Sequence, residues 1–161
     1  MIPFFTLQAL QDKPLPVYGD GKNVRDWISV DDHSSAILML LDKGKEGEVY
    51  AISCGEEYST LEMAQKILRI LGKPQELITF VKDRPAHGRR YSVNSAKLRA
   101  LGWKPHNSFD DTLNETIQWY AENKSWLDAV TRENKDINAK ISMSYAVKRY
   151  SDKKQFNHNK V

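Results

Sequence analysis

The segment Asp83–Tyr91 (DRPAHGRRY) concentrates side chains that could hold an anion. Within seven residues it carries three guanidinium groups and an imidazole, from Arg84, His87, Arg89 and Arg90. Pro85 and Gly88 disfavour a helix, so the segment is predicted to be a loop. Arginine is always charged and can donate two hydrogen bonds to one phosphate or carboxylate. The pattern predicts a clamp for a phosphorylated small molecule, or alternatively a solvated basic loop that pairs with surface acids.

Other chemical motifs find little support in the sequence. There is no G-x-G-x-x-G and no Walker-type loop. The single cysteine, Cys54, and four scattered histidines do not have zinc-site spacing. The acids Asp31 and Asp32, next to His33, are better explained as the start of a helix than as an acid/base cluster. We therefore expect no catalytic residues and no metal in this chain.

Two Tyr-x-x-x-Lys spacings also occur in the sequence. Between Tyr18 and Lys22, Gly19 and Gly21 interrupt any helix, and the second pair lies close to the C-terminus at Tyr150 and Lys154. Such a pair supports catalysis only on one helix beside a cofactor, so both spacings are interpreted as coincidental.

Charge is distributed unevenly along the 161 residues. From Arg132 onward there are eight Lys or Arg against three Asp or Glu, whereas the rest of the chain is slightly acidic. A broad nucleic-acid surface would need a positive folded body, so this partner class is not expected. No apolar run approaches the roughly 20 residues of a membrane span. The N-terminus lacks a basic signal flank and the lone cysteine cannot form an internal disulfide, so we expect a cytoplasmic protein without a membrane partner.

Hydrophobic periodicity predicts alternating helices and strands, hence a mixed α/β or α+β fold. Ser59–Glu62 (STLE) is a capping box that starts one of the helices. The tryptophans Trp103, Trp119 and Trp126 are expected in the core. The predicted strands are 15–18, 25–30, 48–53 and 78–81, and the predicted helices are 2–11, 31–43, 60–71, 95–101 and 109–123. Residues 1–130 are expected to form one domain, and 131–161 a basic, flexible tail.

Several runs together resemble a known family. In order and spacing, the chain resembles the C-terminal half of dTDP-glucose 4,6-dehydratases, which are nucleotide-sugar enzymes of the extended short-chain dehydrogenase/reductase family. The resemblance covers roughly residues 2–128, and the Arg-Pro-x-His-x-Arg-Arg-Tyr motif at 84–91 is its most specific part. The other runs that carry it are KPLPVYG at 13–19, RDWI at 25–28, VDDH at 30–33, LGWKP at 101–105 and WY at 119–120.

The resemblance implies a pocket for a dTDP-sugar. In the family pattern, Pro16 and Tyr18 lie against the thymine base. Arg25 and Arg84 correspond to diphosphate and ribose contacts, and His87 to a further nucleotide contact. Thr60 occupies the position of an asparagine that usually binds the sugar nucleotide, and Ala51 also replaces a family asparagine.

The resemblance also implies that the reaction machinery lies elsewhere. The intact family uses NAD to oxidise the sugar at C4, eliminates water across C5–C6 and returns the hydride. Its NAD loop, Tyr-x-x-x-Lys pair and Asp-Glu pair belong to an N-terminal Rossmann portion that this sequence lacks. Residues 25–53 would complete that portion's sheet, so apolar faces around Trp27, Ile28, Leu38, Leu41 and Tyr50 are expected to lack cover.

Three interpretations of the function stay open at this point. The first is a truncated dehydratase-like protein that binds a dTDP-sugar, holds no cofactor and is inactive alone. The second is a non-catalytic interaction module, which either pairs as a split-enzyme subunit with a separate NAD-binding chain or uses its basic tail as an adhesive arm. The uncovered apolar faces also predict a homo-oligomer. The third is a degenerate gene product without function.

Overall fold

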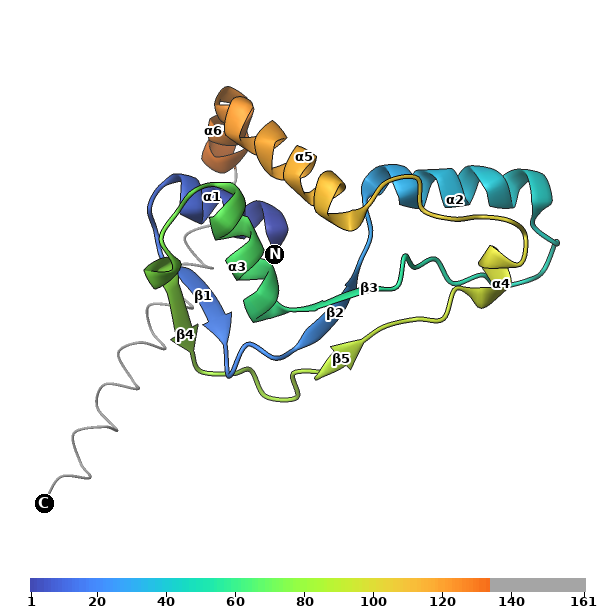
Figure 1. Cartoon of the computed structure of the whole chain (residues 1–161), viewed down its shortest axis with the longest axis horizontal. Coiled ribbons are helices and arrows are strands. Elements are labelled where there is room, and N and C mark those ends of the chain that lie inside the picture. The colour runs from blue at the N-terminus through green and yellow to red at the C-terminus, as the bar shows by residue number, and fades with distance from the viewer. Residues whose placement is uncertain (134–161) are drawn as a thin grey trace, which may run out of the picture.

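A computed structural model describes residues 1–133 and confirms the predicted mixed α/β architecture (Figure 1). Helices and short strands alternate along the chain. In order, the elements are α1 Ile2–Leu10, β1 Leu15–Tyr18, β2 Val24–Trp27, α2 Val30–Lys43, β3 Glu56–Ser59, α3 Thr60–Ile70, the 3-10 helix η1 Gln75–Leu77, β4 Ile78–Val81, β5 Arg90–Tyr91, α4 Ala96–Arg99, α5 Phe109–Glu122 and α6 Lys124–Glu133.

The main core lies between β1 and the helices α1, α3 and α5. Helix α3 buries one apolar stripe, in which Met63, Ala64, Ile67 and Leu68 recur at helical spacing. On β1 the core-facing residues are Leu15 and Val17, because alternate residues of a strand point to opposite faces. Helices α1 and α5 complete the cluster with Phe5, Ala9, Leu113 and Ile117.

Two small sheets position the segments that carry the charged side chains. Strand β1 pairs in parallel with β4, with Pro16 opposite Thr79 and Tyr18 opposite Val81. Strand β2 lies between β3, which is antiparallel to it, and β5, which is parallel to it. Because β4 leads through residues 82–89 into β5, this loop passes beside the turn that joins β1 to β2 (Figure 1).

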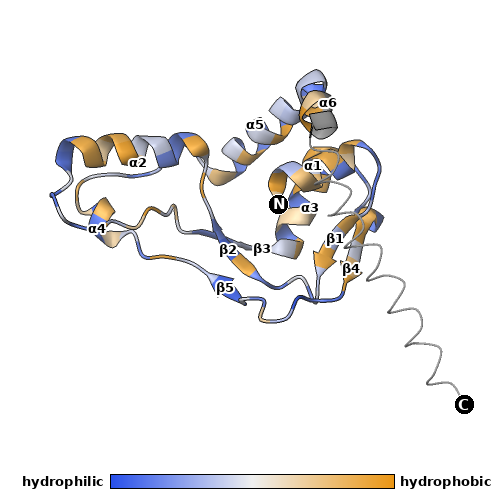
Figure 2. Cartoon of the chain, turned by 180° about the vertical axis from the view of Figure 1, so that it is seen from behind, coloured by the Kyte–Doolittle hydropathy of each residue, from blue (hydrophilic) through white to orange (hydrophobic). Residues whose placement is uncertain are grey.

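Helix α2 extends away from the main core and packs against a second cluster. Ala36 of α2 is buried with Leu98 of α4 and with Trp103. The other side of α2 is exposed, although it carries Val30, Leu38 and Leu41, which are 76%, 67% and 80% accessible. Figure 2 shows apolar residues along this projecting helix.

Local capping signals in the sequence are confirmed. Ser59 accepts a hydrogen bond from the Glu62 N–H, and the Glu62 carboxylate accepts one from the Ser59 N–H, which forms the predicted capping box of α3. Helix α2 begins slightly earlier than its acids suggest, because Ser29 is the N-cap and accepts from the Asp32 N–H. Asp31 and Asp32 lie in the first turn, where negative charge is favourable.

The prediction of a strand at residues 48–53 is wrong. This segment has no strand neighbour among residues 1–133, and an unpaired strand cannot satisfy its backbone. The strand forms instead at Glu56–Ser59, where β2 supplies the partner. Ser53 is fixed by side chains, since its hydroxyl donates to Asp26 and its carbonyl accepts from Ser95.

The tryptophan prediction is correct only in part. Trp103 is buried, but Trp119 and Trp126 are 45% and 47% exposed. These two rings pack edge to face on each other across the α5–α6 junction instead of entering the core.

Helix α6 was not predicted, and the predicted boundary at residue 130 falls within it. Most of the predicted tail, 134–161, lies outside the described residues. Over residues 1–133, no helix has the length and apolar character to cross a membrane.

Asp32 joins the start of α2 to the loop before α5. Its carboxylate accepts from the Ser29 hydroxyl at 2.9 Å and from the His106 backbone N–H at 2.8 Å, and the residue is only 4% exposed. Burial would raise the pKa of Asp32, but the hydrogen bonds from His106 and Ser29 outweigh it and hold the pKa below its usual value.

We predict that Asp32→Ala lowers the free energy of unfolding by about 2 to 3 kcal/mol at neutral pH, because buried donors lose a charged acceptor. A lowered folded-state pKa gives stability that is present above the ordinary carboxyl pKa of about 3.9 and is lost as the pH falls through the folded-state value. The difference between wild type and variant should therefore shrink in acid. Urea unfolding at several pH values measures it, with exposed Asp31→Ala as the control; equal losses for the two variants would contradict this role.

Candidate functional site

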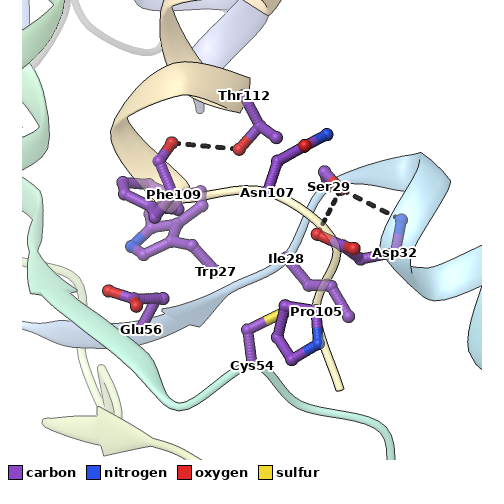
Figure 3. Close-up of a pocket in the computed structure, with 10 residues that line it drawn as sticks. All are labelled: Trp27, Ile28, Ser29, Asp32, Cys54, Glu56, Pro105, Asn107, Phe109 and Thr112. Carbon is purple, nitrogen blue, oxygen red and sulfur yellow. Dashed lines mark hydrogen bonds between the residues drawn. The ribbon is translucent and has the colours of Figure 1, made fainter. Parts of the chain in front are cut away.

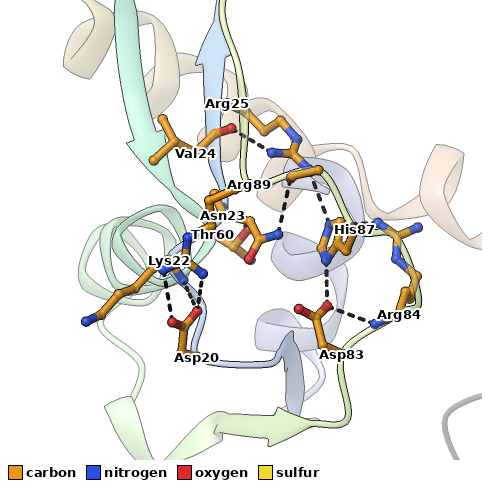
Figure 4. A network of polar contacts seen from close by, with 11 residues as sticks. Asp20, Lys22, Asn23, Val24, Arg25, Thr60, Asp83, Arg84, His87 and Arg89 are labelled. Carbon is orange, nitrogen blue, oxygen red and sulfur yellow. Dashed lines mark hydrogen bonds and ion pairs between the residues drawn. The ribbon is translucent and has the colours of Figure 1, made fainter.

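Two arginines from separate parts of the chain converge on one imidazole (Figure 4). Arg25 projects from β2 and Arg84 from the 82–89 loop. Their guanidinium nitrogens lie 3.2 Å and 2.9 Å from Nε2 of His87. The structure therefore brings together three of the residues singled out in the sequence, although Arg25 and Arg84 are 59 positions apart in the sequence.

The contacts define the hydrogen-bonding state of His87. A guanidinium can only donate, so Nε2 must be the acceptor and the ring hydrogen must lie on Nδ1. Nδ1 donates to the Asp83 carboxylate at 2.6 Å. Asp83 also accepts from the Arg84 backbone N–H, and these contacts, that of His87 foremost, lower the pKa of Asp83. The His87 side chain is only 9% exposed, and its Nε2 accepts from both guanidinium groups.

Two tyrosine rings support the arginines from outside. The Arg84 guanidinium carbon lies 5.0 Å from the centre of the Tyr18 ring, and that of Arg25 lies 4.2 Å from the Tyr91 ring. His87 meets Tyr18 edge-on, with ring centres 5.9 Å apart. Gly88 is required here, because a Cβ at this position would overlap the Tyr91 ring.

The other two arginines of the loop are already neutralised. Arg89 makes a two-pronged ion pair with Asp20 at 2.8 and 3.0 Å, and Arg90 makes one with Glu57 at 2.6 Å for both contacts. The hydrogen bond from Arg89, followed by that from the Lys22 backbone N–H, lowers the pKa of Asp20 to about 2. For these two arginines the alternative of a solvated, acid-paired loop is correct.

Arg25 and Arg84 differ from Arg89 and Arg90 in their partners. Within residues 1–133, neither guanidinium has a carboxylate within ion-pairing distance. Besides His87, Arg25 donates to the backbone carbonyl of Val24. Two adjacent cations that share one neutral acceptor leave several donors available. The arrangement is suited to an oxyanion that can accept from both.

Thr60 and Asn23 form the floor beside the loop. Thr60 opens α3, and both its N–H and its hydroxyl donate to the Asn23 carbonyl, at 3.0 and 3.3 Å. The buried Asn23 amide donates to the Gly88 carbonyl at 3.3 Å. Thr60 thus holds the loop through Asn23 and is not among the residues in contact with His87.

Pro16 lies two positions before Tyr18 on β1, so both point to the face opposite the core residues of that strand. Pro16 is buried, while Tyr18 is half-buried beside Arg84 and His87. Tyr91, Asn23 and Asp83 were not predicted to belong to the site. Asp83 and Tyr91 could have been found from the sequence, because they stand at the two ends of the basic segment. Asn23 could not, because its contacts arise from tertiary packing.

A small cavity of about 20 Å³ lies apart from this cluster, between β2, the start of α2 and the start of α5 (Figure 3). Trp27, Asp32 and Cys54 contribute to its wall, and it has room for about one water molecule. Burial, assisted by the carboxylates of Asp32 and Asp26, raises the pKa of the Cys54 thiol to about 11. A thiol that stays protonated at neutral pH is a poor nucleophile, so this cavity does not indicate covalent chemistry.

The turn between β1 and β2 does not have the form of a dinucleotide-binding loop. Strand β1 leads through the Gly19–Gly21 turn into another strand, β2, whereas dinucleotide-binding motifs place the diphosphate at the start of a helix. Nor does any group of three or more His, Cys, Asp or Glu within residues 1–133 stand in a position to hold a metal ion.

Comparison with known proteins places these residues in context. A family model described as GDP-mannose 4,6 dehydratase matches residues 1–116. A dTDP-glucose 4,6-dehydratase of Neisseria meningitidis serogroup B is 44% identical over 138 residues, which cover 78% of this chain and 39% of that protein. A dTDP-glucose 4,6-dehydratase of Salmonella typhimurium is 40% identical, with 81% of this chain and 38% of that protein covered.

Solved structures give the same result. The dTDP-glucose 4,6-dehydratase of Bacillus anthracis in complex with NAD has a TM-score of 0.73 and 44% identity, covering 78% of this chain and 40% of that one. The enzyme of Streptomyces venezuelae has a TM-score of 0.74 and 41% identity, covering 78% and 39%. The Bacillus anthracis structure contains NAD, and the Streptomyces venezuelae structure contains NAD together with a second bound ligand. The chain spans about 40% of the length of these relatives, so it matches a fragment of their fold.

Titration of Asp20 can distinguish Arg89, which is paired with that carboxylate, from Arg84, which has no acidic partner among residues 1–133. We predict that Arg89→Ala raises the pKa of Asp20 from about 2 toward the ordinary value of about 3.9, because the bidentate partner is lost. Carboxyl-carbon NMR shifts followed against pH measure the change. Arg84→Ala, which removes an equal charge from the same loop, should leave the Asp20 titration in place; equal shifts in both variants would show that the pairing is not specific.

Proposed function

This chain belongs to the GDP-mannose 4,6 dehydratase family of nucleotide-sugar enzymes, and from that premise we propose that it binds the nucleoside diphosphate of a dTDP-sugar through Arg25, Arg84 and His87. The observation that carries the proposal is the convergence of the two acid-free arginines on His87. A diphosphate offers oxygens on two adjacent phosphorus atoms, which suits two neighbouring guanidinium groups.

The surrounding residues support the same assignment. Tyr18 lies half-buried beside Arg84 and offers a ring against which a nucleotide base can pack, and buried Pro16 lies on the same face of β1. Thr60 is assigned a supporting place at the base of the site, because its donors are used on Asn23. We assign the thymine base to the Tyr18 side and the diphosphate to the side where the arginines meet.

We further propose that this chain does not dehydrate the sugar by itself. Hydride transfer needs NAD, and neither the sequence nor the β1–β2 turn provides a dinucleotide loop. The residues around His87 can orient and neutralise a diphosphate, but they include no group placed to exchange a hydride. Binding without turnover is the function that the described residues support best.

Isothermal titration of the 161-residue chain with dTDP-glucose tests this proposal. Arg84→Ala should weaken binding by about 10- to 100-fold, since a charge-assisted hydrogen bond contributes about 1.5 to 3 kcal/mol. Arg90→Ala is the matched control, because Arg90 is paired with Glu57 and should change the affinity by less than about threefold. Undiminished binding by the Arg84→Ala variant would remove the arginine pair from the site.

A second candidate function rests on the exposed face of α2. Val30, Ile37, Leu38 and Leu41 recur at intervals that place them along one side of the helix, and all four are exposed. Unpartnered apolar faces of this kind mark protein interaction sites. Homologous structures bind NAD, whereas this chain has no dinucleotide loop, so the NAD-binding part lies in the portion of the relatives that this chain does not match. We propose that such an NAD-binding chain covers α2.

This pairing is tested by mixing the chain with the unmatched portion of the Neisseria meningitidis relative. A complex should form in sedimentation experiments, and the double variant Leu38→Asp/Leu41→Asp should weaken it by about 100-fold or more, because burial of each leucine contributes about 1.5 to 3 kcal/mol. Val93→Asp, which changes an exposed apolar residue away from α2, is the control. Equal binding by the double variant would contradict the interface, and α2-dependent self-association without the second chain would favour a homo-oligomer instead.

A further inference from the structure

We propose that His87 takes up a proton when the site binds a nucleotide diphosphate, so that a neutral acceptor between two arginines becomes a third cation facing the ligand. The inference rests on the proposed function, because it concerns the response of that same site to its ligand. It assigns His87 a role that is distinct from simple contact, namely the coupling of anion binding to proton binding.

In the structure, Nε2 of His87 accepts from two donors with a single lone pair. Arg25 at 3.2 Å and Arg84 at 2.9 Å both approach Nε2, which leaves no space or lone pair for a hydrogen there. A proton on Nε2 would face two guanidinium groups directly. This geometry therefore favours a ring without a hydrogen on Nε2.

A diphosphate reverses this preference. Its charged oxygens are stronger acceptors than an imidazole nitrogen, so both guanidinium groups gain by turning toward them. Nε2 then loses its donors and faces a phosphate oxygen, to which it can donate only if it is protonated. The Asp83 carboxylate, 2.6 Å from Nδ1, is already in place to stabilise the resulting imidazolium.

The charges that face His87 agree with the uptake of one proton. Arg84 and Asp83 approach from the loop, Arg25 from β2 and neutral Tyr18 from β1. The neighbouring Asp20 and Arg89 neutralise each other, and the Lys22 side chain points away from His87 in Figure 4. These groups sum to a single positive charge, whereas the diphosphate of a nucleotide sugar carries two negative charges. One proton on His87 restores neutrality.

Calorimetry with dTDP-glucose in buffers of different ionisation enthalpy measures the coupling. This ligand is chosen because each of its phosphates has one ester link and one anhydride link and so has no ionisation near neutral pH, whereas the terminal phosphate of dTDP titrates near pH 6 and would release or bind protons itself. PIPES, HEPES and Tris at one pH near neutrality give the number of protons from the slope of binding enthalpy against buffer enthalpy. We expect uptake of up to about one proton, and an affinity that falls by up to about tenfold per pH unit as the pH rises.

The variant His87→Gln keeps a side-chain oxygen that can accept from the arginines but cannot be protonated near neutral pH. It should abolish the buffer dependence, while His33→Gln, on the exposed side of α2, should retain it. A buffer dependence that survives in the His87→Gln variant would place the proton elsewhere and overturn the inference.

Ring-nitrogen NMR of the wild-type chain decides the matter even if the variant does not fold. The spectra should show a hydrogen on Nδ1 only in the free state and on both nitrogens of His87 in the complex. Binding without proton uptake, or a neutral ring in the saturated complex, would overturn the inference and leave the proposed function intact. An absence of binding by the wild-type chain would instead refute the proposed function, and the inference with it.

Discussion

The parallel pairing of β2 with β5 is the constraint on which the candidate site depends. It aligns Val24 with Arg90 and Arg25 with Tyr91, and the Val24 N–H donates to the Arg89 carbonyl at 2.8 Å. These backbone contacts hold the end of the 82–89 loop against β2. Without them, Arg25 would have neither the Tyr91 ring nor His87 within reach, and the loop would be free to extend into solvent. The short pairing of β2 with β5 thus determines how the charged side chains around His87, which come from different parts of the chain, are arranged.

The same loop shows how one residue type can serve two purposes. Arg89 and Arg90 are bound by Asp20 and Glu57, and such exposed pairs contribute little to stability because water screens them. Each pair joins the loop to a different neighbouring segment, the β1–β2 turn through Asp20 and β3 through Glu57. Arg25 and Arg84 meet an imidazole instead of a carboxylate. No carboxylate of the described residues neutralises their charge.

Helix α2 has one side that packs within the described part of the chain and one side that is exposed. Its inner side is held by Ala36 and by Asp32, which reaches the loop before α5, while its outer side carries uncovered apolar residues. A helix that is apolar on two sides belongs between two layers, and only one of them is present in the described part of this chain. The short span relative to the homologues has the same consequence, since most of the relatives' length has no counterpart here.

The sequence by itself determined the local features of this protein. Helix periodicity and the Ser59–Glu62 capping box depend on neighbours within a few residues, and the capping box and helices α1, α2, α3 and α5 formed where they were predicted. The family resemblance likewise rested on short motifs, and the comparisons confirm it. Strand placement was less accurate: residues 48–53 have the composition of a strand but no partner within residues 1–133, whereas Glu56–Ser59 has a partner in β2.

Only the tertiary structure decided which charges are available. All four arginines have the same chemistry in the sequence, and their spacing does not show that Asp20 and Glu57 neutralise two of them. The exposure of Trp119 and Trp126 was equally hidden, because α6 was not foreseen and an aromatic ring can be covered by another ring at the surface. The physical reason is common to these cases: hydrogen bonds, ion pairs and burial depend on residues distant in the chain, and their positions are fixed only once the sheets have paired.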